Sequence, residues 1–140
     1  MSEVYSGAVD RGLEGVVACT TAISSIVDAT LCYRGYTIED LAEHSTFEEV
    51  AFLLWNDRLP KEKELESFMK EMGKHMHLSP DLVKVLQSLP TSSVHPMAWL
   101  RSSASLLSLW DSEAQAESIE SRHHVAMRLL ARFGTLVSLL

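Results

Sequence analysis

The pattern of apolar and polar residues divides the chain into an extended first part and a helical remainder. Residues 16–34, VVACTTAISSIVDATLCYR, are rich in Val, Ile and Thr, which favours extended backbone. Asp28 and Ala29 are expected to form the turn of a short hairpin, although a tight hairpin turn prefers Gly at its second position. Gly35 then permits backbone angles that other residues avoid. Residues 1–15 show little periodicity and are interpreted as an arm.

From Thr37 onward, capping residues and apolar spacing predict about six helices. Thr37 is suited to cap IEDLAEH, and Thr46 with Glu49 forms a capping box before FEEVAFLLW. The segment NDRLP is expected to break that second helix. Ser79 precedes a Pro at the first position of a helix that Pro90 ends. Another helix is expected over Leu65 to Met76, and a further one begins at Pro96 and covers PMAWLRSSASLLSLW. After a polar connection, the last helix is expected to begin near Ile119 to His123.

Three of these helices carry apolar residues at helical spacing, which predicts the faces that pack in the core. The faces are Phe47, Val50, Ala51 and Leu54, then Leu65, Phe68, Met69, Met72 and Met76, and lastly Met97, Leu100, Ala104 and Leu107. Trp55, Trp99 and Trp110 are interpreted as packing residues.

The last helix turns almost wholly apolar from Val125 and runs to the end of the sequence without a stop signal. Only Arg128, Arg132 and Gly134 interrupt it, and TLVSLL lacks the Gly, Pro or basic residues that usually mark a helix end. We expect the chain to be truncated at Leu140, the alternative being a frayed helix docked on its own core.

These elements predict the all-α fold class with a small N-terminal β-element. We expect one unit over residues 1–140, with the arm and a short β-hairpin over 1–36 and helices over 37–140.

Composition and charge exclude several classes of protein. The chain has 140 residues, an apolar fraction of 46% and a net charge of -7. A net negative charge argues against nucleic acid as a partner, because that affinity comes largely from neutralised phosphates. No run is long enough to span a membrane, and the acidic N-terminus lacks the features of a secretion signal, so we expect a cytoplasmic protein. Cys19 and Cys32 lack metal-site spacing and are interpreted as small apolar fillers.

Few residues are candidates for chemistry. His75 and His77, like the adjacent pair His123 and His124, are spaced so that each pair points to different sides of a helix, which argues against a metal site. His95 directly precedes Pro96 at the mouth of a helix, where it is suited to cap backbone N–H groups, and a structural role is favoured.

Two arginines, Arg34 and Arg101, are open to two interpretations. Each is able to bind an anionic ligand such as a CoA phosphate, or to hold a helix end or a carboxylate, and the second interpretation is favoured. The sequence contains neither the G-x-S-x-G motif nor a Gly-rich phosphate loop.

A series of motifs in fixed order resembles the N-terminal part of the citrate synthase family. The motifs are G-L-x-G-V at Gly12–Val16, Y-R-G-Y at Tyr33–Tyr36, F-E-E-V-x-x-L-L at Phe47–Leu54, L-P at Leu59-Pro60, and H-P-M-x-x-L-R at His95–Arg101. AMRLLARFGTLVSLL resembles the helix that follows, so the match extends from about Gly12 to Leu140. The chain departs from the family at Asp28-Ala29, where Gly is frequent, and at Gly134, where Pro is frequent.

The resemblance implies a mostly helical homodimer that condenses acetyl-CoA with oxaloacetate and water, giving citrate and CoA in the tricarboxylic acid cycle. Its catalytic set of two histidines and an aspartate is expected in sequence that follows Leu140, and His95 matches a different motif. No catalytic, cofactor-binding or metal-binding residue is therefore assigned here. Acetyl-CoA is expected as a substrate of the full-length enzyme, with no tightly bound cofactor. The alternatives are a 2-methylcitrate synthase that uses propionyl-CoA and a complete, non-catalytic helical binding module.

Overall fold

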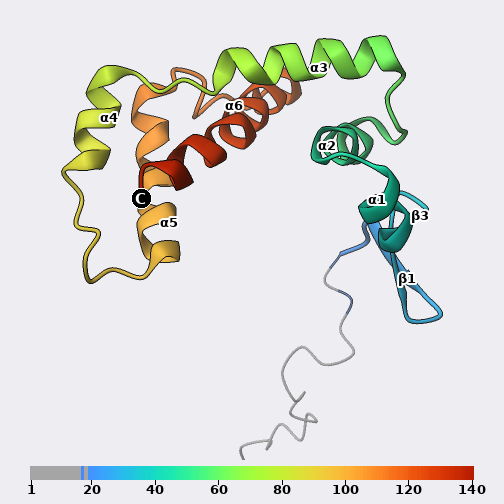
Figure 1. The fold of residues 1–140 in the computed structure, drawn as a ribbon. Coiled ribbons are helices and arrows are strands. Elements are labelled where there is room, and N and C mark those ends of the chain that lie inside the picture. The colour runs from blue at the N-terminus through green and yellow to red at the C-terminus, as the bar shows by residue number, and fades with distance from the viewer. Residues whose placement is uncertain (1–16, 18) are drawn as a thin grey trace, which may run out of the picture. The chain divides into compact units, whose positions relative to one another are not determined.

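The computed structural model describes residue 17 and residues 19–140 and divides into two compact units (Figure 1). One unit ends at Arg58 and the other spans Leu59–Leu140. The arm that the sequence predicts over residues 1–15 lies outside the described residues, and a single unit over residues 1–140 stays a prediction.

The first unit begins with a small antiparallel sheet of three strands in the order β1-β2-β3. The strands are β1 Ser24–Val27, β2 Thr30–Tyr33 and β3 Tyr36–Thr37. The predicted hairpin is confirmed, since Val27 pairs with Thr30 across the turn at Asp28 and Ala29. The short third strand was not predicted.

Both turns of this sheet require left-handed backbone. Asp28 and Ala29 have φ values of 48° and 68°, and Arg34 and Gly35 have values of 48° and 87°. Two consecutive positive φ values are what a two-residue hairpin turn needs to match the strand twist. Gly35 adopts this conformation at little cost, whereas Ala29 does so against its own preference.

The helices of the first unit, α1 Ile38–His44 and α2 Phe47–Asn56, begin at their predicted caps. The Thr37 hydroxyl accepts from the backbone N–H of Asp40 at 3.2 Å. The backbone N–H of Thr46 donates to Glu49 Oε2 at 2.7 Å, and the backbone N–H of Glu49 donates back to Thr46 Oγ1 at 3.3 Å. The predicted break is confirmed at Asp57, whose φ of 63° ends α2.

The buried residues of this unit differ in part from the predicted apolar face. They are Cys32, Leu41, Ala51, Phe52 and Leu53. Phe47 stands at the exposed start of α2 with 62% of its surface accessible. Cys32 is the apolar filler that was expected, but Cys19 is exposed, so that part of the interpretation was wrong.

The second unit consists of helices joined by connecting segments, with no strand among its described residues. Its elements are α3 Glu62–His75, α4 Pro80–Gln87, α5 Pro96–Leu107, the 3₁₀ turn η1 Ser108–Trp110, and α6 Ile119–Ser138. The four α-helices of this unit, with α1 and α2, agree with the prediction of about six helices from Thr37 onward. None of the described helices is long and apolar enough to cross a membrane.

The core of the second unit lies where α4, α5 and α6 meet. Its buried cluster consists of Leu82, Leu86, Trp99, Leu107 and Leu136. On α5 the buried positions are Trp99, Ser103 and Leu107, whereas Met97 is 62% exposed. Of the predicted stripe on α5, Leu107 lies in the core and Leu100 packs against it, but Met97 does not; Trp99, predicted as a packing residue, is buried there.

Helix α3 packs against α6, and two hydrogen bonds fix the end of α3. Arg132 Nε donates to the backbone oxygen of His75 at 3.3 Å, and Thr135 Oγ1 donates to that of Met76 at 2.8 Å. Carbonyls at the end of a helix lack partners within the helix, so α6 supplies them. Of the methionines predicted in this core, Met72 is buried, but Met69 and Met76 are about half exposed.

Candidate functional site

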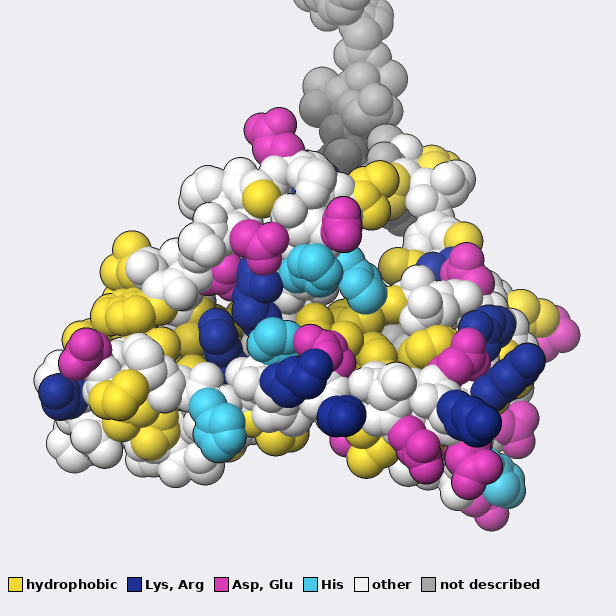
Figure 2. Space-filling model, turned by 90° about the horizontal axis from the view of Figure 1, so that it is seen from above, with side chains coloured by type: hydrophobic (Ala, Val, Ile, Leu, Met, Phe, Trp, Pro, Cys, Tyr) yellow, Lys and Arg dark blue, Asp and Glu magenta, His cyan; other side chains and the backbone are white. Residues whose placement is uncertain are grey.

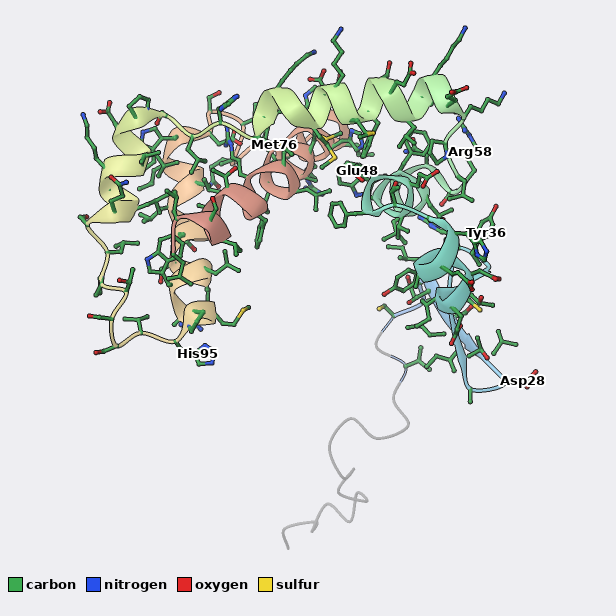
Figure 3. All side chains as sticks on the ribbon, in the orientation of Figure 1. Asp28, Tyr36, Glu48, Arg58, Met76 and His95 are labelled. Atoms are coloured by element: carbon green, nitrogen blue, oxygen red, sulfur yellow. The ribbon has the colours of Figure 1, made fainter. Side chains whose placement is uncertain are left out.

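Two of the candidate residues from the sequence, His95 and Arg34, make contacts that stabilise the fold. His95 Nδ1 accepts from the backbone N–H of Met97 at 3.2 Å, and so caps the start of α5 (Figure 3). The capping role predicted for His95 is therefore confirmed. Arg101 is exposed on α5, and neither interpretation of it is tested.

Arg34 ties the hairpin to the end of α2. Its guanidinium donates to the backbone oxygen of Ala22 at 3.2 Å and to that of Leu54 at 3.0 Å. It also forms an ion pair with Asp57, with Nη1 and Oδ1 2.6 Å apart. The interpretation that Arg34 holds a helix end and a carboxylate is confirmed.

One histidine of the first pair, His75, and both of the second pair line one hollow in the second unit. An open hollow of about 390 Å³ lies between α3 and α6 and is lined by Glu71, His75, His123, His124, Met127 and Arg128. Histidine side chains lie close together on the face drawn in Figure 2. Sequence spacing missed this grouping because His75 is brought to His123 and His124 only by the packing of α3 on α6.

The acidic groups beside this hollow already have cationic partners. Glu71 Oε1 lies 3.2 Å from His75 Nε2, and Glu71 is also hydrogen-bonded to Lys74. The hydrogen bond from Lys74, with a smaller contribution from His75, lowers the pKa of the Glu71 carboxyl. His124 Nδ1 lies 3.9 Å from Glu113 Oε1, which places this ring beside the segment that precedes α6.

Arg128 is the centre of the best-defined polar cluster among the described residues. Its Nε and Nη2 donate to the two oxygens of Asp111 at 2.9 and 2.7 Å, and its Nη1 donates to Glu113 Oε2 at 2.7 Å. The Arg128 side chain is 15% exposed and that of Asp111 is 10% exposed. Such a two-pronged contact is geometrically specific and stronger than a neutral hydrogen bond.

The pKa values of the cluster shift as this geometry requires. Hydrogen bonds from Arg128 lower the pKa of the Asp111 carboxyl, because they favour its charged form over the opposing effect of burial. The hydrogen bond to Asp111 in turn raises the pKa of Arg128. Both groups are therefore ionised at neutral pH.

Arg128, Asp111 and Glu113 hold the segment between α5 and α6 in place. The Arg128 guanidinium is already bound to two carboxylates. Among the described residues, no group of three or more His, Cys, Asp or Glu side chains is placed to hold a metal ion. The cluster therefore fixes the connection between α5 and α6. The sequence offered one signal for it, which is Arg128 in a largely apolar helix that follows an acidic segment.

Comparison with known proteins gives a consistent set of relatives. The family model described as "Citrate synthase, C-terminal domain" matches residues 12–140. Citrate synthase 2 of Bacillus subtilis is 46% identical over 128 residues, which cover 91% of this chain and 34% of that protein. 2-Methylcitrate synthase 2 of Corynebacterium glutamicum is 36% identical over 141 residues, covering 99% of this chain and 37% of that protein.

Solved structures agree with the sequence relatives. Citrate synthase from Pyrobaculum aerophilum matches with a TM-score of 0.79 and 34% identity, covering 91% of this chain and 34% of that one. Citrate synthase from Thermotoga maritima matches with a TM-score of 0.76 and 32% identity, covering 94% of this chain and 34% of that one. The chain thus spans about a third of the length of the relatives it matches.

Proposed function

The chain belongs to the citrate synthase family, and on that premise we propose that it forms the N-terminal segment of the large domain of a citrate synthase. The complete enzyme condenses acetyl-CoA with oxaloacetate and water to give citrate and CoA. The observation that carries this proposal is the match over residues 12–140, supported by 46% identity to a citrate synthase. Acetyl-CoA is a substrate in this scheme, and no tightly bound cofactor is needed.

The catalytic groups are proposed to lie outside this chain. In the proposed reaction a carboxylate removes a proton from the methyl group of the thioester, a neutral histidine steadies the enol, and a second histidine polarises the ketone. Citryl-CoA is then hydrolysed. Of the histidines described here, His95 is engaged as a helix cap, and we assign it no catalytic role. The isolated chain is therefore proposed to be inert.

The role proposed for this segment is that of a rigid scaffold. Arg34 joins the hairpin to α2, and Arg128 joins the connecting segment to α6. Closure of a small domain over the large one excludes water from the reaction, and such a motion needs a large domain that does not deform. The helix caps and the two arginine clusters support that role.

A 2-methylcitrate synthase that uses propionyl-CoA is the second candidate. The relatives include proteins of both names, at 46% identity for a citrate synthase and 36% for a 2-methylcitrate synthase. Thiol release by the complete polypeptide with acetyl-CoA and with propionyl-CoA, each with oxaloacetate, distinguishes the two. A higher kcat/KM with acetyl-CoA supports the first candidate, and a higher value with propionyl-CoA supports the second.

We further propose that the full-length enzyme is a cytoplasmic homodimer and binds small molecules rather than nucleic acid. The net charge of -7 supports the exclusion of nucleic acid. A complete, non-catalytic helical module is the competing account of the same chain.

Reading the coding DNA beyond Leu140 tests the proposal against that module. We expect the open frame to run on into helical sequence that carries the two histidines and the aspartate. A stop codon directly after Leu140 would overturn the proposal and favour the binding module.

A further inference from the structure

The start of α5 is capped by a side chain that can gain a proton near neutral pH. Pro96 has no N–H, so Met97 carries the first backbone donor within the helix, and this N–H donates to His95 Nδ1 at 3.2 Å. The N–H groups of Ala98 and Trp99 donate instead to the backbone oxygen of His95. A ring nitrogen accepts a hydrogen bond only through a free lone pair, so this cap requires a neutral His95 with its proton on Nε2.

This cap differs from the side-chain caps of the other described helices. Those caps are the hydroxyls of Thr37, Thr46, Ser79 and Ser118, which do not titrate near neutral pH. The first turns of α1, α2, α3, α4 and α6 also contain an acidic residue, whereas the first turn of α5 contains none. A positive charge at the start of a helix is unfavourable, because the N-terminal end of the helix dipole is itself positive. Nothing in the first turn of α5 therefore offsets a charge on His95.

The elements around the start of α5 bring no charged partner to His95. The connection from α4, residues 88–94, contains no charged residue, and the first charge along α5 is Arg101. On α4, Asp81 Oδ1 and Lys84 Nζ pair with each other 3.3 Å apart, and the last turn of α6 contains no basic residue. Among the described residues, no ion pair joins His95 to these groups or to the terminal carboxylate. Its ring is exposed at the end of the connection (Figure 3).

We propose that His95 makes the start of α5 a pH-sensitive switch. The neutral ring holds the first turn of the helix. As the pH falls, a proton from the solvent binds the lone pair of Nδ1, and the resulting imidazolium, with N–H donors at both nitrogens, no longer accepts from Met97. The backbone N–H of Met97 then loses its acceptor, and the positive ring opposes the helix dipole. The first turn of α5 is therefore released between about pH 8 and about pH 5, the range over which histidine changes charge.

The burial of the neighbouring residues limits the change to the first turn. Met97 is 62% exposed, so water can reach the N–H that protonation releases. Trp99 is 3% exposed and lies in the core cluster with Leu107 and Leu136, which holds the rest of α5 in place. The expected response is therefore fraying of residues 95–98 and of the connection before them, without unfolding of the unit. The switch thus acts on the segment that joins α4 to α5.

A cap that does not titrate tests the switch. Asn caps a helix through its side-chain oxygen, so His95→Asn keeps the cap at every pH, and His95→Ala removes it at every pH. Urea unfolding monitored by tryptophan fluorescence compares the three chains, which share all other histidines. Between about pH 8 and about pH 5, the unfolding equilibrium constant of the parent chain is expected to rise about five-fold relative to that of His95→Asn. The ratio of the two variants should stay constant. A constant ratio of the parent chain to His95→Asn would overturn the proposal.

The ring gives a second measurement in the unmodified chain. At about pH 8, the nitrogen NMR spectrum of the His95 side chain is expected to show Nδ1 without a proton, and the Met97 amide signal is expected to move with the ring as the pH falls. The Leu82 amide, which donates to the Ser79 hydroxyl at 3.3 Å, is the matched control and should not follow that titration. A proton on Nδ1 of the neutral ring, or a Met97 signal that does not follow the ring, would contradict the inference. The outcome does not depend on the proposed enzymatic function.

Discussion

At the scale of single residues, Ala29 has an unfavourable backbone conformation and Arg128 binds two carboxylates. Ala29 adopts a left-handed backbone that Gly adopts more readily. The guanidinium of Arg128 donates three hydrogen bonds to two carboxylates. Both positions lead to predictions that do not depend on the function of the protein.

Replacing Ala29 by Gly is expected to stabilise the hairpin by about 0.5–1 kcal/mol, because Gly removes the steric cost of positive φ but adds entropy to the unfolded chain. Chemical denaturation of the variant measures the gain. Ala42→Gly, in the exposed middle of α1, is the matched control and is expected to destabilise by about 1 kcal/mol. Destabilisation by both substitutions would contradict the turn geometry.

Replacing Arg128 by Met is expected to destabilise the second unit by about 2 kcal/mol, because Asp111 then loses its charged partner at a largely buried position. Urea unfolding monitored by tryptophan fluorescence measures the loss. Arg122→Met, at an exposed position of α6, is the control and should have little effect.

The same cluster predicts a dependence of stability on pH. Arg128 lowers the pKa of Asp111 in the folded state, so the folded chain keeps this carboxylate ionised to a lower pH than the unfolded chain does. The stabilisation is therefore complete above the unfolded pKa of about 3.9 and is lost as the pH falls through the lowered folded value. Asp111→Asn should remove this part of the acid dependence, and an unchanged acid transition would contradict the assignment.

At the scale of elements, the helix starts follow from local sequence. Thr37, Thr46 and Ser79 cap α1, α2 and α4 as predicted, because a cap depends only on residues within one turn. Turns also depend on a few neighbouring residues, so the hairpin turn at Asp28 could be predicted from the sequence.

Removing the cap of α2 by Thr46→Ala is expected to destabilise that helix by about 1 kcal/mol, because the N–H of Glu49 loses its acceptor. Faster amide hydrogen exchange in the first turn of α2 reports the change. Thr46→Ser keeps the hydroxyl and should restore most of the protection, whereas equal exchange in the two variants would exclude a capping role.

The features that the sequence did not predict are those that join distant parts of the chain. The burial of Trp99 was predicted but the exposure of Met97 on α5 was not, because the orientation of a helix is decided by the elements that pack on it. The partners of Arg34 and Arg128 lie up to 23 and 17 positions away in the sequence. The hollow lined by His75, His123 and His124 likewise exists only once α3 packs on α6.

At the scale of the whole molecule, exposed apolar residues on α6 predict self-association of the isolated chain. Leu129 and Val137 of α6, and Leu140 just beyond it, are 37%, 58% and 44% exposed and present apolar side chains to water. Light scattering coupled to size exclusion is expected to show a mass that rises with concentration. Val137→Glu should reduce that rise, and a monodisperse monomer at high concentration would contradict the prediction.

The chain belongs to the citrate synthase family, and it matches only part of each relative. The chain covers about a third of those proteins, with 34% coverage of the Bacillus subtilis relative and 34% of the Pyrobaculum aerophilum structure. An assay of the complete gene product is therefore needed to test the central claim.

The most direct measurement is the release of CoA thiol from acetyl-CoA, with and without oxaloacetate, by the complete polypeptide and by this 140-residue chain. The account predicts release by the complete polypeptide that depends on oxaloacetate, and no release by the chain alone. Turnover by the chain alone, or a folded complete polypeptide that releases no thiol from acetyl-CoA or propionyl-CoA, would contradict it.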